Sequence, residues 1–161
     1  MDNISQYVGE KLLAKNWKIS VAESCTGGLV SKMMTDIAGS SQWFDRGFIT
    51  YTNEAKIDML AISESTLEKY GAVSLQIVEE MAAGVLANSL AEISLAISGI
   101  AGPSGGSVEK PVGTVCFAWA NKQGQSLSEV KLFSGDREAI RLKAANYALE
   151  GVLNHFFQNS E

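Results

Sequence analysis

The sequence has 161 residues, of which 46% are hydrophobic and 19% are charged, and this composition is typical of a globular protein rather than a disordered one. A chain of this length forms one domain whose core needs no disulfide or metal, so we expect a single domain over residues 1–161. The formal net charge is −5, which argues against nucleic-acid binding, since that requires a face rich in lysine and arginine. A small anionic ligand is still allowed, because one helix N-terminus and one arginine suffice for a phosphate.

The cysteine and histidine content excludes further classes. Cys25 and Cys116 belong to no CxxC pair and the chain has one histidine, which argues against a disulfide framework and a Cys/His zinc site. The first residues lack the basic start and apolar core of a signal peptide, and no apolar run approaches the roughly 20 residues that span a bilayer. We therefore expect a cytoplasmic protein that has no Cys/His zinc site and does not bind a membrane.

Helices and strands alternate along the chain, as judged from hydrophobic periodicity and turn residues. N-caps are expected at Asn53, Ser65 and Asp136, and Ser74 is expected to start a long helix. In chain order we expect a helix over 4–15, a strand over 17–22, a helix from the turn at 26–28 to Gly39, a strand over 48–52, short helices over 53–60 and 65–70, a helix over 74–86, strands over 93–98, 112–120 and 126–133, and a helix over 136–156. This order predicts an α/β protein, a three-layer αβα sandwich over a mixed, mostly parallel sheet.

Three segments with unusual chemistry follow predicted strands, at 22–28, 50–56 and 98–106. In open α/β sheets, ligands bind beyond the carboxyl ends of the strands. We therefore expect the three segments to meet in one cleft.

The first of these segments places Ser24 and Cys25 after a strand, with Thr26, Gly27 and Gly28 at the start of a helix. Free backbone N–H groups at such a helix start can hold an oxyanion or a phosphate. The same composition is also typical of a plain turn in which Ser24 or Thr26 caps the helix. Both interpretations stay open at this point.

A serine nucleophile requires a base. The only histidine, His155, lies beside Phe156 in the last helix, which is more typical of packing than of catalysis. Lys56 is the remaining candidate, as in Ser-Lys variants of the catalytic triad, because burial lowers the pKa of a lysine. Tyr51 could relay or orient the proton. A solvated lysine and a half-buried strand tyrosine are the alternatives.

The third segment, from Ser98 to Gly106, has four glycines and one proline. It lacks the Gly-Lys-Ser/Thr ending of a P-loop, but its N–H groups can form an anion-binding nest. Near the start of the last helix, Arg137 and Arg141 could bind phosphate bidentately. The alternative is a capped helix with two surface arginines.

Together these segments resemble the CinA C-terminal-domain family, the nicotinamide-nucleotide amidases. Seven matching blocks occur in the order of the family and extend from the first strand to the last helix. They are AESCTGG at 22–28, GSSQWF at 39–44, TYTNEAK at 50–56, GAVS at 71–74, SGIAGPSGG at 98–106, EKPVGTV at 109–115 and GDRE at 135–138.

The resemblance implies hydrolysis of the carboxamide of nicotinamide mononucleotide to nicotinate mononucleotide and ammonia, without a metal or other cofactor. It implies Ser24 as nucleophile, Lys56 as general base and Tyr51 as its partner. The residues implied to bind the substrate are Glu23, Thr26, Gly27, Gly28, Ser98, Gly99, Ile100, Ala101 and Gly102, to which we add Arg137 and Arg141. In other members of the family this domain is fused behind a larger N-terminal domain. Because a single domain is expected here, the resemblance implies the stand-alone form.

In the mechanism that follows, Lys56 takes the Ser24 proton, the serine oxygen attacks the carboxamide carbon, and N–H groups near 26–28 hold the oxyanion. Ammonia leaves and water hydrolyses the acyl-enzyme. Cys25 is the alternative nucleophile, and a non-catalytic nucleotide-binding or regulatory module is the alternative function. Exposed strand edges and apolar helix faces favour a homodimer.

Overall fold

The computed structural model describes residues 3–158, and its elements follow the predicted order. The helices are α1 (Ile4–Lys15), α2 (Leu29–Thr35), α3 (Asn53–Leu60), α4 (Glu64–Tyr70), α5 (Leu75–Ala87) and α6 (Arg137–Phe156), with a 3₁₀ turn at Ser40–Gln42. The strands are β1 (Ile19–Glu23), β2 (Phe44–Ile49), β3 (Ile93–Gly99), β4 (Thr114–Asn121) and β5 (Ser126–Leu132). None of the helices in this part of the chain combines the length and apolarity that crossing a bilayer requires.

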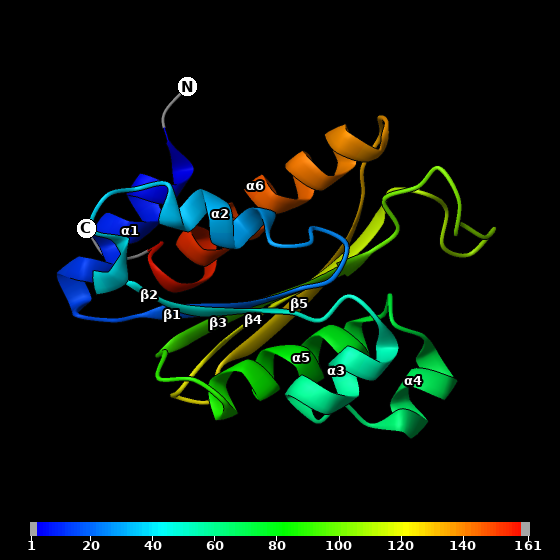
Figure 1. The fold of residues 1–161 in the computed structure, drawn as a ribbon, viewed down its shortest axis with the longest axis horizontal. Helices are drawn as coiled ribbons and strands as arrows, with labels where there is room; N and C mark the ends of the chain where they lie inside the picture. The colour runs from blue at the N-terminus through cyan, green and yellow to red at the C-terminus, as the bar shows by residue number, and fades with distance from the viewer. Residues whose placement is uncertain (1–2, 159–161) are drawn as a thin grey trace.

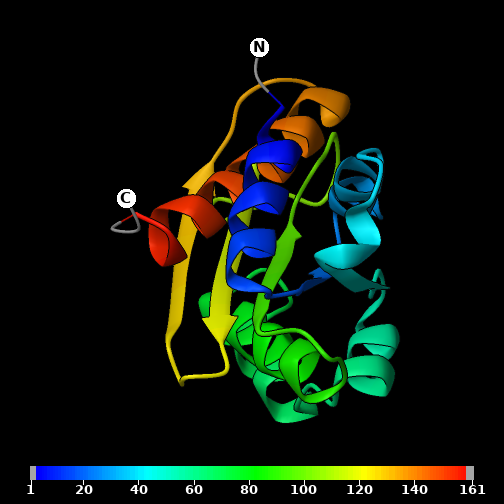
Figure 2. The same ribbon diagram turned by 90° about the vertical axis from the view of Figure 1, so that its left-hand side faces the viewer.

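The strands form one sheet in the order β2-β1-β3-β4-β5. Strand β1 pairs in parallel with β2 and β3, whereas β4 is antiparallel to both of its neighbours. Over residues 3–158, every strand except β4 therefore runs in one direction. Figures 1 and 2 show α1, α2 and α6 on one side of the sheet and α3, α4 and α5 on the other. The predicted three-layer sandwich over a mixed sheet is confirmed.

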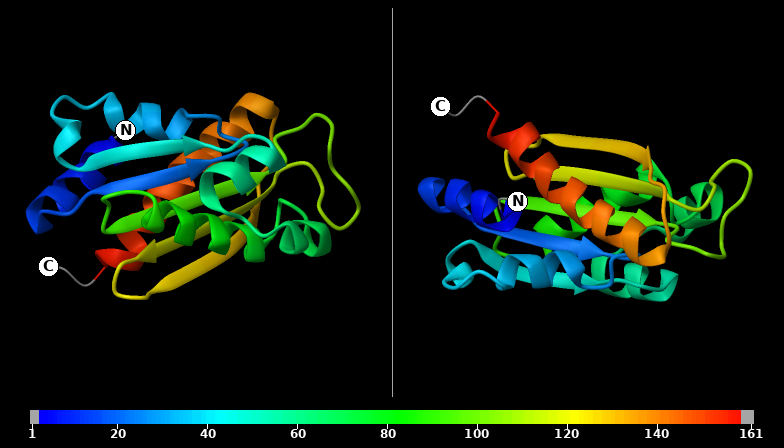
Figure 3. Two further views of the ribbon diagram at one scale, coloured as in Figure 1. Left: turned by 60° about the horizontal axis from the view of Figure 1, so that its bottom comes forward. Right: turned by 90° about the horizontal axis from the view of Figure 1, so that it is seen from above.

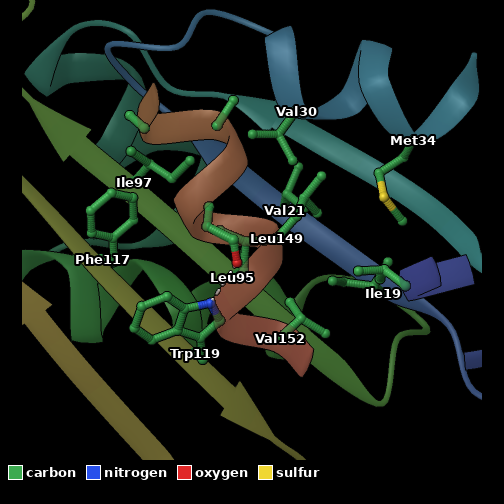
Figure 4. Close-up of a cluster of buried hydrophobic side chains, with 14 of the residues drawn as sticks. Ile19, Val21, Val30, Met34, Leu95, Ile97, Phe117, Trp119, Leu149 and Val152 are labelled. Atoms are coloured by element: carbon green, nitrogen blue, oxygen red, sulfur yellow. Dashed lines mark hydrogen bonds between the residues drawn. The ribbon is translucent and has the colours of Figure 1, made fainter. Parts of the chain in front are cut away.

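The hydrophobic core lies on both faces of the sheet, because β1, β3 and β4 are buried almost throughout. Under α6, Phe117 stacks on Trp119, and the Trp119 indole donates to the carbonyl oxygen of Ala148 at 2.9 Å (Figure 4). Gly151 lies against the Trp119 ring, where a Cβ atom would overlap it. The opposite face buries an apolar side of α5 against the small side chains of the sheet.

The predicted N-cap Asp136 is confirmed, and Ser74, which was expected to start a helix, is the N-cap of α5. The side chains of Ser74 and Asp136 accept hydrogen bonds from the first turns of α5 and α6. The predicted caps Asn53 and Ser65 are wrong, since Thr52 caps α3 and Ser63 caps α4. Both stretches offer several cap-forming residues in succession, so local composition does not select among them.

Strand β2 occupies Phe44–Ile49 rather than the predicted 48–52. Asp45, Arg46 and Gly47 look like a turn, yet they lie within a strand that pairs with β1 at the edge of the sheet, with a register shift between the paired residues Phe44 and Gly47. An edge strand exposes one side and tolerates such polar residues. The chain leaves the sheet after Thr50, whose N–H still donates to the Glu23 carbonyl at 2.9 Å. Tyr51 and the start of α3 therefore lie at the carboxyl end of β2.

Candidate active site

The three segments that follow β1, β2 and β3 meet at one end of the sheet. Next to Thr50 and Glu23, the Ser24 N–H donates to the Ile97 carbonyl oxygen at 3.0 Å. The loop between β3 and β4 projects past this end of the sheet (Figure 3). A cleft of about 290 Å³ opens here, lined by Ser24, Cys25, Tyr51, Asn53, Lys56, Ala72, Val73, Ser98, Gly99, Ile100, Ala101, Gly102, Ser104, Gly105 and Arg137.

At the base of the cleft, Lys56 Nζ lies 3.0 Å from Ser24 Oγ. Both residues are buried, with exposed fractions of 1% for Lys56 and 8% for Ser24. The amine also donates to the carbonyl oxygens of Thr50 at 3.0 Å and Tyr51 at 3.5 Å. Helix α3 creates this arrangement because it begins at the Thr52 cap and turns Lys56 back toward the strand end it has just left.

The surroundings of Lys56 favour its neutral form. Within residues 3–158, no carboxylate forms an ion pair with its amine, and burial lowers the pKa of Lys56 below its ordinary value, an effect that the Cys25 thiolate would partly offset. A neutral amine donates to the two carbonyls and keeps a lone pair, which the Ser24 hydroxyl can donate to. The arrangement is therefore chemically suited to remove the Ser24 proton.

Cys25 also lines the cleft but lacks the properties of an activated nucleophile. Its side chain is buried, and burial is the largest cause that raises the pKa of the thiol to about 11. Since the thiolate is the reactive form, very little of Cys25 is reactive near neutral pH. The amine of Lys56 is bonded to Ser24, so the geometry favours the serine.

Tyr51 approaches Lys56 through its backbone rather than its side chain. The phenol is half exposed, and its hydroxyl accepts a hydrogen bond from Arg137 Nη2 at 3.0 Å. Arg137 Nη1 donates to the Gly102 carbonyl at 2.7 Å. Arg137 thus joins Tyr51 to the β3–β4 loop at the wall of the cleft.

Arg141 lies outside the cleft. Its Nε donates to the Cys25 carbonyl at 3.0 Å and its Nη2 to the Thr26 carbonyl at 3.1 Å. The prediction that Arg141 contacts the substrate does not agree with this position, because α6 directs its guanidinium to the back of the turn that carries Ser24.

Glu23, which was predicted to bind substrate, also lies outside the cleft. Its side chain is fully buried and points under α2, where Oε1 accepts from the Thr26 hydroxyl and the Gly28 N–H. The Gly27 N–H donates to the Ser24 carbonyl at 3.1 Å. These N–H groups are already bonded, and Thr26, Gly27 and Gly28 do not line the cleft. The N–H groups of Gly27 and Gly28 are therefore engaged within the turn, and the oxyanion site expected near 26–28 stays a prediction.

Comparison with known proteins agrees with this architecture. The sequence matches the CinA C-terminal domain family over residues 1–156. The chain belongs to this family. It is 57% identical to the nicotinamide-nucleotide amidohydrolase PncC of Enterobacter agglomerans, covering 99% of this chain and 97% of that protein. Identity to the protein of that name from Escherichia coli K12 is 52%, covering 98% and 95%. The crystal structure of the competence/damage inducible protein CihA from Agrobacterium tumefaciens superposes with a TM-score of 0.89 at 42% identity, covering 96% of both chains.

This CinA domain also contains cleft residues that were not singled out from the sequence. They are Asn53, Ala72, Val73, Ser104 and Gly105, all of which lie within the matching blocks at 50–56, 71–74 and 98–106. Their membership of those blocks was the available signal. His155 packs against the core as expected, with its ring centroid 4.5 Å from that of Trp119. Within residues 3–158, His, Cys, Asp and Glu side chains form no group of three or more that could hold a metal.

Proposed function

We propose that this CinA-family protein hydrolyses the carboxamide of nicotinamide mononucleotide, giving nicotinate mononucleotide and ammonia. The observation that carries the chemistry is the 3.0 Å contact between Lys56 Nζ and Ser24 Oγ in a buried site. The substrate is proposed because relatives more than half identical over nearly their full length are named nicotinamide-nucleotide amidohydrolases.

In the proposed first step, neutral Lys56 takes the hydroxyl proton of Ser24 as Oγ bonds to the carboxamide carbon. The resulting ammonium gives a proton to the amide nitrogen, the C–N bond breaks and ammonia leaves. Lys56 then takes a proton from water, whose oxygen attacks the acyl carbon, and returns the proton to Ser24 Oγ as the ester breaks. The lowered pKa of Lys56 supports both directions of proton transfer, because it makes the neutral amine more available and its ammonium a better acid.

The oxyanion formed in both steps requires donors on the cleft wall. Ser98 follows Ile97, whose carbonyl accepts the Ser24 N–H. Ser24, directly after β1, and Ser98, near the end of β3, therefore lie side by side. Ser98 and Asn53 both line the cleft. We assign the oxyanion to the Ser98 hydroxyl and the Asn53 side-chain amide, since the N–H groups of Gly27 and Gly28 are bonded within the turn.

Arg137 is the proposed phosphate ligand. Its guanidinium lies at the cleft wall, already bonded to Tyr51 and to the Gly102 carbonyl, and a guanidinium can bind a phosphate bidentately. The loop residues Gly99, Ile100 and Ala101 form the adjacent wall. Tyr51 is proposed as the partner of the catalytic pair, through its carbonyl contact with Lys56 and its hydroxyl contact with Arg137.

Ammonia release from nicotinamide mononucleotide, by the wild type and by Ser24→Ala, tests the proposal. We expect turnover by the wild type and none by the variant at unchanged fold. Binding of the nucleotide without turnover by the wild type would instead support a non-catalytic binding module. The homodimer stays a prediction, which sedimentation analysis checks.

A further inference from the structure

The turn that carries Ser24 is held on one side by a buried anion. Oε1 of Glu23 accepts from the Thr26 hydroxyl at 2.7 Å and from the N–H groups of Gly28 at 3.1 Å and Val30 at 3.0 Å. Oε2 accepts from both the N–H and the hydroxyl of Ser31 at 2.8 Å. Gly28, the N-cap of α2, has no side chain to bond these donors. Glu23 therefore satisfies the start of α2 from the end of β1.

The other side of the same turn is held by a cation. Arg141, on α6, donates from Nε to the Cys25 carbonyl at 3.0 Å and from Nη2 to the Thr26 carbonyl at 3.1 Å. Gly27 leaves room for this approach, since a Cβ there would lie 3.2 Å from Nη2. The two carbonyls belong to the residues that directly follow Ser24.

We propose that Glu23 and Arg141 are positioning residues that fix the backbone of residues 24–28, and through it the direction of Ser24 Oγ toward Lys56. The proposal rests on the proposed function for its effect on rate. Charge-assisted hydrogen bonds are stronger than neutral ones, and burying a carboxylate away from water is costly unless its oxygens are bonded. An uncharged side chain such as serine or threonine can cap a helix without burying a charge, so the use of two charged side chains around this turn points to a requirement for rigidity beside the nucleophile.

Neither side chain lines the cleft, which separates this role from substrate binding. We call Glu23 and Arg141 the clamp residues. Loss of either one should lower kcat and leave KM nearly unchanged, because substrate contacts persist while the nucleophile is misplaced. A misplacement of about 1 Å costs on the order of 10²-fold in rate, and we expect a loss of this order.

The test compares Glu23→Gln and Arg141→Lys with Glu92→Gln. Glu92 is a matched control because its carboxylate accepts the Lys18 N–H at 2.7 Å, just before the opposite end of β1. For each protein, kcat and KM with nicotinamide mononucleotide are measured alongside hydrogen–deuterium exchange of the peptide covering 22–31. In the two clamp variants we expect lower kcat, unchanged KM and faster exchange confined to this peptide, and in the control none of these changes.

A rise in KM at constant kcat would overturn the proposal by making these residues substrate ligands, and unchanged exchange in both clamp variants would overturn it as well. Should Glu23→Gln fail to fold, Arg141→Lys carries the test alone, since Arg141 is only partly buried. Exchange does not depend on turnover. If the wild type releases no ammonia, the proposed function fails while the exchange data still decide whether the clamp exists.

Discussion

Lys56 reaches Ser24 across 32 residues of sequence, and the contact depends on where two elements end. Ser24 follows β1 directly, and Lys56 lies in the first turn of α3, which starts four residues after β2. Because β1 and β2 are parallel neighbours, their carboxyl ends lie together. The buried Lys56 amine meets the Ser24 hydroxyl at this end of the sheet.

Replacing Lys56 with methionine should abolish ammonia release while the protein stays folded. The change keeps most of the buried volume and removes the base, and loss of general-base catalysis costs about 10²–10⁴-fold. Steady-state ammonia assays and thermal unfolding check this. Lys32→Met is the control, since Lys32 is exposed and pairs only with Asp36. Wild-type rates in Lys56→Met would remove Lys56 from the mechanism.

The rate should depend on pH through Lys56. Burial lowers its pKa from 10.5, and the neutral amine is the active form, so kcat/KM should rise with pH and be lost as pH falls through the lowered pKa. A pH profile of kcat/KM should place the midpoint of this limb below 10.5. The same limb should persist in Cys25→Ala. Its disappearance there would assign it to the thiol.

Cys25→Ala should retain most of the activity. Burial keeps the thiol protonated, with a pKa of about 11, and the substitution removes only one sulfur from the cleft wall. Ammonia release by Cys25→Ala and Ser24→Ala, measured side by side, checks this. The opposite pattern, with an active Ser24→Ala protein, would identify Cys25 as the nucleophile.

Arg137→Leu should weaken binding of the phosphate. A charge-assisted hydrogen bond contributes about 1.5–3 kcal/mol, so KM for nicotinamide mononucleotide should rise roughly tenfold or more. The riboside, which lacks the phosphate, should show little change between the wild type and the variant. An equal effect on both compounds would mean that Arg137 acts through the Tyr51 and Gly102 contacts instead.

Gly151→Ala should destabilise the protein although it lies inside α6. Helix propensity alone favours alanine by about 1 kcal/mol, but the new Cβ would overlap the Trp119 ring, and overpacking costs about 1–3 kcal/mol. Denaturant unfolding should show a lower free energy of unfolding. Asn154→Ala, at an exposed position of the same helix, should leave stability unchanged or raise it, and equal behaviour of both variants would contradict the packing argument.

The order and type of the elements were determined by the sequence alone. Hydrophobic periodicity and helix-start residues such as Ser74 and Asp136 are local properties, and they predicted the sandwich and the three segments that meet at the site. The blocks around Ser24, Tyr51 and Lys56 also carried the family resemblance. Each of these signals is contained within a few consecutive residues.

The positions of Glu23, Arg137 and Arg141 were decided only by the tertiary structure. Local sequence places a carboxylate beside a serine and two arginines one turn apart, and both patterns are compatible with substrate binding. The packing of α2 on β1 buries Glu23 beneath the turn, and the course of α6 directs Arg137 into the cleft and Arg141 behind it. The direction of a side chain relative to a distant segment depends on how whole elements pack, and no pattern within one segment contains that information.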